Sequence, residues 1–237
     1  MLLVERGLAE SRRQAQALLL AGRVRVAGAP ATKAGALAPA DAAIEVAGDE
    51  TPYASRAGAK LAGALDDFRI DPAGRVCLDA GSSTGGFTDC LLQRGARRVY
   101  AVDVTTSQLA WKLRRDPRVV LIEKNARQLT PADIGEPAQL VTADLSFISL
   151  AKVVPALAPL AALGADLVLL VKPQFELERG AVGKGGIVRD PALHRHAVDA
   201  VKAAVMAAGL AVVGERPSKV PGAEGNVEFF VHAQKPS

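Results

Sequence analysis

The stretch from Val76 to Leu92, VCLDAGSSTGGFTDCLL, constrains the fold of this chain more than any other. Its pattern predicts a short buried strand that ends in Asp79, a turn of small residues, and an amphipathic helix from about Phe87. Glycine permits positive φ and lets the backbone approach a ligand closely. The start of the helix adds unpaired N–H groups and a positive dipole end. This arrangement is typical of a nucleotide-like cofactor bound above the carboxyl end of a strand in an open α/β sheet.

A second acidic residue indicates which cofactor binds there. The run RVYAV from Arg98 predicts the next strand, which ends in Asp103, where a carboxylate can accept hydrogen bonds from both hydroxyls of a ribose. NAD-binding turns follow G-x-G-x-x-G, but the turn from Gly81 lacks the middle glycine that a pyrophosphate needs. Asp79 also suits a cationic amino acid better than a phosphate. We therefore expect S-adenosylmethionine, with NAD or a plain strand–helix turn as the alternatives.

Composition narrows the class of protein. Of the 237 residues, 49% are hydrophobic and 23% are charged, which is ordinary for a soluble globular protein. With only two cysteines and three histidines, neither a disulfide framework nor a structural zinc site is expected. The sequence shows no basic-then-apolar leader and no uncharged run approaching the roughly 18 residues of a membrane helix. We expect a cytoplasmic protein that uses no metal and no membrane, and a monomer is favoured.

Two unlike parts follow one another along the chain. Residues 1–46 predict short helices and alternating strands, and thus a small α+β domain; 47–55 is the expected linker, and 56–237 the larger domain. Up to Ala40 the chain has six basic and two acidic residues, which equals the net charge of +4 of the whole sequence. The positive charge is therefore concentrated at the amino end, which favours a polyanionic partner.

The larger part alternates strands and helices. A mostly parallel sheet covered on both faces is expected, with a final antiparallel hairpin whose connection is too short for a crossover helix. The expected strands are 75–79, 98–102, 119–123, 139–143, 166–171, 211–215 and 227–232. Five parallel strands closed by such a hairpin predict the α/β, Rossmann-like, seven-stranded sheet of class I methyltransferases.

Several motifs in order resemble a known family. The segment from Leu2 to Gly28 is similar to the small RNA-binding domain of ribosomal protein S-four. The motifs YASRAGAKL, DAGSSTGGFTDCLL, TADLSFISL, LVKPQFE, GKGGIVRD and GNVEFF resemble the TlyA family, whose larger domain is similar to FtsJ-type ribosomal RNA 2′-O-methyltransferases. The resemblance implies S-adenosylmethionine-dependent methylation of a ribose in ribosomal RNA, with cytidine as the target and a ribosomal subunit as the partner.

The resemblance also implies a catalytic tetrad of Lys60, Asp144, Lys172 and Glu228. Lys172 would act as general base, Asp144 would orient it, and Glu228 would hold Lys60, whose positive charge would favour the neutral form of Lys172. The residues agree in part, because Asp144 and Lys172 each follow a predicted strand and Glu228 interrupts an apolar one. Each also has an ordinary alternative: a solvated helix residue for Lys60, a loop cap for Asp144 and a surface lysine for Lys172.

The remaining predicted contacts concern cofactor and RNA. Around the cofactor we expect Asp79, Gly81, Ser82, Ser83 and Thr84 at the methionine moiety, Asp103 at the ribose, and Asn125 and Ala126 at the adenine. For RNA we expect Arg12, Arg13, Arg23 and Arg25 in the small domain, and Lys184 and Arg189 in a glycine-rich loop. Phe147 either stacks beside the target nucleotide or packs in the core.

Two other functions stay open at this point. A non-catalytic RNA-binding or ribosome-assembly factor could retain the same fold, although the complete tetrad argues against it. Methylation of a base amine typically uses an Asn/Asp-Pro-Pro-aromatic motif, but the corresponding segment is Asp144-Leu145-Ser146-Phe147. The hemolysin label that some family members carry implies a membrane activity that no hydrophobic run supports.

Overall fold

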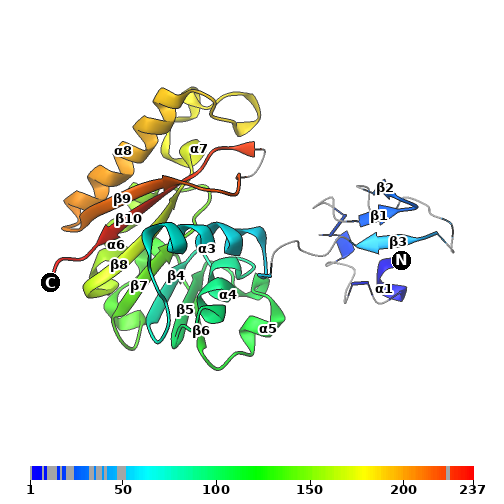
Figure 1. Ribbon diagram of the computed structural model, residues 1–237, viewed down its shortest axis with the longest axis horizontal. Coiled ribbons are helices and arrows are strands. Elements are labelled where there is room, and N and C mark those ends of the chain that lie inside the picture. The colour runs from blue at the N-terminus through cyan, green and yellow to red at the C-terminus, as the bar shows by residue number, and fades with distance from the viewer. Residues whose placement is uncertain are drawn as a thin grey trace. The chain divides into compact units, whose positions relative to one another are not determined.

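The computed structural model describes residues 2–6, 8–9, 15–16, 18–19, 24–31, 35, 39, 42–46, 52–222 and 225–237. They fall into two compact units, Met1–Glu50 and Thr51–Ser237 (Figure 1). Each unit has its own hydrophobic core, so each is described by itself.

The N-terminal unit combines a helix with a small antiparallel sheet. Its elements are α1 (Leu2–Glu5), β1 (Val24–Val26), β2 (Ala29–Pro30) and β3 (Ile44–Val46), and the strand order is β2-β1-β3. Leu3, Ala9, Ala15 and Val24 form the buried cluster. The turn between β1 and β2 runs through Ala27 and Gly28, both with positive φ, which is typical of a tight hairpin. The α+β character predicted for this segment is therefore present in the described residues.

The C-terminal unit is built on a seven-stranded sheet in the order β6-β5-β4-β7-β8-β10-β9. The strands are β4 (Val76–Ala80), β5 (Arg98–Asp103), β6 (Val119–Glu123), β7 (Ala138–Ala143), β8 (Ala161–Val171), β9 (Ala211–Pro217) and β10 (Phe229–Gln234). The strands from β4 to β8 pair parallel, and β10 pairs antiparallel with both β8 and β9. This is the class I methyltransferase sheet that the sequence predicted.

Helices cover both faces of this sheet (Figure 1). They are α3 (Arg56–Phe68), α4 (Gly86–Gln93), α5 (Trp111–Arg114), α6 (Val154–Leu157), α7 (Pro173–Glu176) and α8 (Pro191–Ala207). Short 3-10 turns lie between them: η1 (Thr106–Gln108), η2 (Ala126–Gln128), η3 (Pro131–Asp133), η4 (Leu150–Lys152), η5 (Ala158–Leu160), η6 (Arg179–Ala181) and η7 (Lys184–Gly186). Within the part of the chain that is described, no helix has the length and apolarity needed to span a bilayer.

Alternate residues of each central strand enter two different cores. In β4, Leu78 packs with α6 and α8, whereas Cys77 packs with α3 and α4. All five residues of β4 are buried, as expected for a parallel strand covered on both faces. Truncating one such core leucine to alanine typically lowers the free energy of unfolding by about 2–5 kcal/mol. Packing of this strength on both faces holds the strands, and hence their ends, in place.

Most predicted strands differ from the structure by one or two residues at one or both ends, and β8 begins five residues earlier than predicted. Two differences concern Glu228 and the predicted linker. Strand β10 begins at Phe229, so Glu228 precedes the strand instead of lying within it. Residues 52–55, assigned to the linker, pack on the C-terminal unit: Tyr53 and Ala54 contact its core, and the Ala54 N–H donates to Asp89 at 2.7 Å. The physical reason is that this segment covers the first turns of α3 and α4, where Gly58 leaves room for Tyr53.

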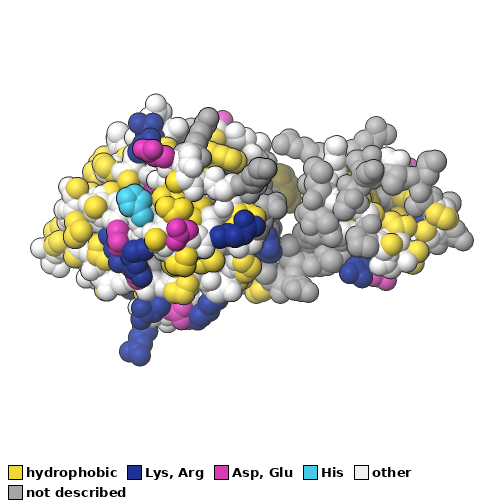
Figure 2. Space-filling view, turned by 90° about the horizontal axis from the view of Figure 1, so that it is seen from above, with side chains coloured by type: hydrophobic (Ala, Val, Ile, Leu, Met, Phe, Trp, Pro, Cys, Tyr) yellow, Lys and Arg dark blue, Asp and Glu magenta, His cyan; other side chains and the backbone are white. Residues whose placement is uncertain are grey.

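The visible surface of the C-terminal unit mixes apolar, polar and charged side chains (Figure 2). Scattered apolar residues of this kind are ordinary on a soluble protein. Phe147 differs from the others because 91% of its surface is exposed, which excludes the core-packing alternative.

Candidate active site

Two loops meet at the carboxyl edge of the sheet. The N–H groups of Gly81 and Ser82 donate to the Val102 carbonyl at 2.8 and 3.0 Å, which anchors the loop after β4 to the end of β5. Gly81 has a φ of +88°, and a Cβ there would collide with the backbone carbonyl of Asp144. Only glycine allows the loop after β4 to approach the loop after β7 this closely.

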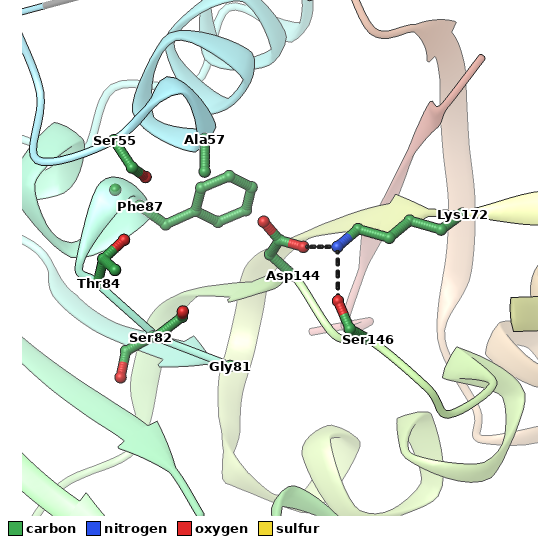
Figure 3. Close-up of a pocket in the computed structure, with 11 residues that line it drawn as sticks. Ser55, Ala57, Gly81, Ser82, Thr84, Phe87, Asp144, Ser146 and Lys172 are labelled. Carbon is green, nitrogen blue, oxygen red and sulfur yellow. Dashed lines mark hydrogen bonds and ion pairs between the residues drawn. The ribbon is translucent and has the colours of Figure 1, made fainter. Parts of the chain in front are cut away.

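A pocket of about 160 Å³ opens where these loops meet (Figure 3). Residues from the starts of α3 and α4 and from the ends of β4, β7 and β8 line it: Ser55, Ala57, Gly81, Ser82, Ser83, Thr84, Gly86, Phe87, Asp144, Ser146 and Lys172. The position is the one where open α/β sheets bind ligands. The residues that line the pocket bring together part of the predicted cofactor turn and half of the predicted tetrad.

One ion pair of the predicted tetrad lies on the pocket wall. Lys172 Nζ is 2.5 Å from Asp144 Oδ1 and donates a hydrogen bond to Ser146 Oγ at 3.1 Å. Figure 3 shows Asp144 and Ser146 converging on the lysine from the loop after β7. A basic side chain held by an ion pair and a hydrogen bond on a pocket wall can bind a ligand hydroxyl or, when neutral, accept its proton.

The other two residues of the tetrad form a second pair. Lys60 Nζ lies 2.6 Å from Glu228 Oε2, and only 2% of the Glu228 side chain is exposed. The β10–β8 register ends with the pair Phe229–Val171, so Glu228, just before β10, and Lys172, just after β8, lie at the same end of these two strands. Gly222 packs against the Glu228 carboxylate, and any larger residue there would collide with it. The pair explains how a carboxylate is buried here, since each charge neutralises the other.

Asp79 does not take the position that the sequence suggested. It is fully buried and accepts hydrogen bonds from Thr88 Oγ1 at 2.6 Å and Thr142 Oγ1 at 3.3 Å. Burial, aided by the Asp144 charge and opposed by the hydrogen bonds from Thr88 and Thr142, raises the pKa of Asp79 from 3.8 to about 7. The expected contact with the methionine moiety is therefore corrected: the chain surrounds Asp79, which supports the turn from beneath.

The predicted ribose and adenine positions lie on the neighbouring strands. Asp103 ends β5 and accepts N–H bonds from Ser83 at 2.9 Å and Thr105 at 3.2 Å, one at each oxygen. Each oxygen keeps a lone pair for a further donor. Asn125 caps the turn after β6 and lines a second pocket of about 220 Å³ with Arg127 and Gln128, while Ala126 is buried. Apart from the Lys172–Asp144 pair and Arg127, these positions offer hydroxyl groups, the Asp103 carboxylate and the Asn125 amide, which fit a nucleoside with an aminoacyl tail.

Known proteins resemble this chain along nearly its whole length. The FtsJ-like methyltransferase family matches residues 53–235, and the S4 domain matches residues 1–40. The 16S/23S rRNA (cytidine-2′-O)-methyltransferase TlyA of Mycobacterium tuberculosis is 54% identical over 231 residues, which cover 97% of this chain and 86% of that protein. The chain belongs to the TlyA family of FtsJ-like methyltransferases.

Other TlyA-family matches carry a different label. Hemolysin A of Brachyspira hyodysenteriae is 43% identical over 229 residues, which cover 95% of each protein. A solved structure of a candidate hemolysin from Streptococcus thermophilus superposes with a TM-score of 0.79 at 40% identity, covering 100% of this chain and 87% of that one. The predicted family and fold class are confirmed, and the family implies S-adenosylmethionine as predicted.

The predicted RNA contacts are only partly described. Arg12, Arg13 and Arg23 lie outside the described residues, as does the side chain of Lys184. Arg25 is exposed on β1, where Val24 faces the core, and Arg189 is exposed just before α8. These two arginines are accessible to a phosphodiester backbone, and their role stays a prediction.

Several residues at this edge were not singled out from the sequence. Ser146 contacts Lys172, and Glu176 accepts hydrogen bonds from Ser149 Oγ at 2.6 Å and from the Leu150 N–H at 2.8 Å. Burial raises the pKa of Glu176 above its ordinary value. The only sequence signal for them is their place in the motifs TADLSFISL and LVKPQFE. The residue pattern within each motif does not indicate that the two segments contact each other.

Proposed function

We propose that this chain transfers a methyl group from S-adenosylmethionine to the 2′-hydroxyl of a cytidine ribose in ribosomal RNA. The observation that carries the proposal is the Lys172–Asp144 pair on the wall of the pocket at the carboxyl edge of a class I sheet. The name of the M. tuberculosis relative supports the choice of ribose, cytidine and ribosomal RNA. S-adenosylmethionine would supply an electrophilic methyl group on a positively charged sulfur.

The chain's own residues would hold the cofactor along three strand ends. Gly81, Ser82, Ser83 and Thr84 would surround the methionine end in the pocket of about 160 Å³. Asp103 would accept from the ribose hydroxyls of the cofactor with its remaining lone pairs, and Asn125 would bond the adenine with Ala126 beneath it. This arrangement leaves the pocket end beside Lys172 for the reacting groups.

Lys172 would act as the general base. A ribose hydroxyl is a weak acid, so its proton must leave as the oxygen bonds to the methyl carbon. The neutral amine of Lys172 takes this proton while Asp144 holds the amine in place and stabilises the ammonium that forms. Much of the acceleration comes from holding the hydroxyl in line with the carbon–sulfur bond that breaks, whose electron pair returns to sulfur.

Lys60 and Glu228 would shape this end of the pocket. The expectation that the positive charge of Lys60 favours neutral Lys172 needs revision, because the adjacent Glu228 carboxylate offsets that charge. We infer instead that the pair packs beside Lys172 and holds the end of β10 in register. Removing either partner would leave one buried charge unpaired.

RNA recognition would involve both units. Residues 1–46 would form the RNA-binding domain and 56–237 the methyltransferase domain; of the predicted linker 47–55, residues 52–55 would belong to the methyltransferase domain, on which they pack. Arg12, Arg13, Arg23 and Arg25 would contact RNA in the first, and Lys184 and Arg189 in the last. The chain would act as a monomer in the cytoplasm, where ribosomal subunits are found.

The proposal is tested by incubating the protein with radiolabelled S-adenosylmethionine and ribosomal subunits from a strain that lacks the gene. Primer extension sensitive to 2′-O-methylation then maps the label. Wild type should label one ribose position, Lys172→Ala should not, and Lys202→Ala should, because Lys202 pairs with Glu215 away from the pocket. No transfer to either subunit or to naked rRNA would contradict the proposal and favour a non-catalytic RNA-binding factor.

A further inference from the structure

Ser146 contacts Lys172 in addition to the ion-pair partner Asp144. Ser146 Oγ accepts a hydrogen bond from Lys172 Nζ at 3.1 Å, while Asp144 Oδ1 lies at 2.5 Å from the same nitrogen. In Figure 3 the two acceptors approach the nitrogen from different directions, and both also line the pocket. Ser146, which is not part of the predicted tetrad, therefore contacts the same nitrogen as Asp144.

The chemistry of an amine makes this second acceptor important. A neutral lysine has two N–H bonds and one lone pair, and only the lone pair can take a proton. With one acceptor the amine can rotate and point its lone pair in several directions. When the ion pair with Asp144 fixes the position of the nitrogen and Ser146 accepts one N–H bond, rotation of the amine is restricted and the lone pair keeps one preferred direction.

The loop that carries Ser146 is held at both ends. At its start, the Asp144 N–H donates to the Ala80 carbonyl at 3.0 Å. At its end, the partly buried carboxylate of Glu176 accepts from Ser149 Oγ at 2.6 Å and from the Leu150 N–H at 2.8 Å. Glu176 lies in α7, which begins directly after Lys172. The loop is thus tied to the same short segment that carries the lysine.

Within the loop the backbone is constrained as well. Phe147 has a φ of +64°, a conformation that L residues with a bulky side chain rarely adopt. Its ring lies 5.1 Å from that of Phe175, which is again in α7. A strained residue next to Ser146 persists only when its surroundings hold it, and the Glu176 hydrogen bonds supply that restraint.

We propose that Ser146 is a positioning residue that directs the lone pair of Lys172 toward the ribose hydroxyl, and that Glu176 holds Ser146 in place by anchoring the end of its loop. The inference rests on the proposed function, because it assigns Ser146 a role in the step that Lys172 catalyses. It adds to the Lys-Asp-Lys-Glu set a serine and a glutamate that act through Lys172 alone.

Steady-state kinetics with saturating ribosomal subunits tests the role of Ser146. Ser146→Ala should lower kcat roughly tenfold, the effect of losing one hydrogen bond, with both KM values within about twofold of wild type. Ser146→Thr keeps the hydroxyl and should restore most of kcat. Ser237→Ala, which removes an exposed hydroxyl at the chain end, should match wild type. Thermal unfolding of each variant checks that it is folded.

The outcomes separate the inference from the proposed function. If wild type methylates rRNA and Ser146→Ala keeps its kcat, the inference is wrong and the function stands. A raised KM for RNA at unchanged kcat would make Ser146 an RNA contact and overturn the positioning role. Equal losses in Ser146→Ala and Ser146→Thr with lowered Tm would indicate packing instead. No methylation by wild type would contradict the proposed function itself.

A double mutant tests the link through Glu176. If Glu176 acts by holding Ser146, Glu176→Ala should lower kcat by a similar factor, and Ser146→Ala/Glu176→Ala should be no slower than Glu176→Ala alone. Glu176→Gln can still bond Ser149 and the Leu150 N–H and should be less impaired. Losses that multiply in the double mutant would show that the two residues act independently and would overturn this link.

Discussion

The two edges of the central sheet each hold an aspartate paired with a base, but the two clusters differ in how completely their hydrogen bonds are used. At the amino edge, Asp166 accepts from Arg75 at 2.7 Å and lies 2.9 Å from His232 Nε2. At the carboxyl edge, Asp144 pairs with Lys172 beside a pocket.

The amino-edge cluster is closed. Asp166 is 8% exposed, and Gln234 adds a third, longer hydrogen bond at 3.5 Å. Burial alone would raise the pKa of Asp166, but hydrogen bonds from His232 and Arg75 outweigh it and keep the pKa below its ordinary value. Phe68 packs on the His232 ring at 5.0 Å between centroids. With its partners all supplied by the protein, this cluster can only stabilise the fold.

The carboxyl-edge cluster is open by contrast. Lys172 has acceptors in Asp144 and Ser146 and still lines the pocket with bonding capacity left for a ligand. A charged pair in a protein interior can therefore bind a substrate only where some of its hydrogen-bonding positions remain unused.

Loss of the lysine at the carboxyl edge should have the strongest effect on catalysis. Lys172→Ala should lower the rate of methyl transfer by about 10²–10⁴-fold, because a general base is lost. Its Tm should fall less than that of Asp166→Ala, because the Asp144 carboxylate that loses its partner lines the pocket, where water can solvate it. Rate and calorimetry on the same sample check this; a Tm drop as large as that of Asp166→Ala would contradict the distinction.

The matching change at the amino edge should show the opposite pattern. Asp166→Ala should lower the free energy of unfolding by about 3 kcal/mol, because His232 and Arg75 lose their shared partner in a largely buried site. Methyl transfer at 25 °C should be unchanged wherever the variant is folded. Urea unfolding measures the free energy of unfolding, and the label-transfer assay measures methyl transfer. A loss of kcat in folded Asp166→Ala would show that the amino-edge cluster also contributes to catalysis, which would contradict the distinction.

Asp79 gives a pH-dependent test of the buried support beneath the pocket. Its folded-state pKa, raised from 3.8 to about 7, means that the native state binds more protons than the unfolded state between these values. The Asp79 contribution to stability should therefore fall by about 2 kcal/mol from pH 5 to pH 7. Asp79→Asn should lack that decrease. Urea unfolding of both proteins at each pH checks it, and parallel pH profiles would contradict the raised pKa.

The smallest expected effect concerns a surface pair of the same chemical type. Lys219 pairs with Asp67 at 2.6 Å, with the lysine side chain mostly in solvent. Lys219→Ala should change the free energy of unfolding by less than about 1 kcal/mol and leave methyl transfer unchanged, because water screens exposed pairs. Urea unfolding measures this change. If Lys219→Ala lost as much free energy of unfolding as Asp166→Ala, burial would not explain why the two pairs differ in their contribution to stability.

Much of the fold was predictable because its signals are local. Apolar runs ending in Asp79 and Asp103 predicted parallel strands, and Asp144 and Lys172 follow strands whose carboxyl ends necessarily meet at one edge. The Glu228 boundary was misplaced because apolar pattern alone does not show where pairing with β8 stops.

The rest depended on contacts between distant segments. The burial of Asp79 results from Thr88 and Thr142, which lie 9 and 63 residues away in sequence. Ser146 reaches Lys172 because of the path of a loop with a positive φ at Phe147, which a sequence pattern does not predict for this residue type.

The most direct test of the central claim is nucleoside mass spectrometry of ribosomal RNA from cells that lack the gene, complemented with wild type or with Lys172→Ala. We expect 2′-O-methylcytidine in the wild-type complement, with the methyl group on the ribose fragment, and its absence in the Lys172→Ala complement. A methyl group on the base fragment, or equal 2′-O-methylcytidine in both complements, would contradict the claim.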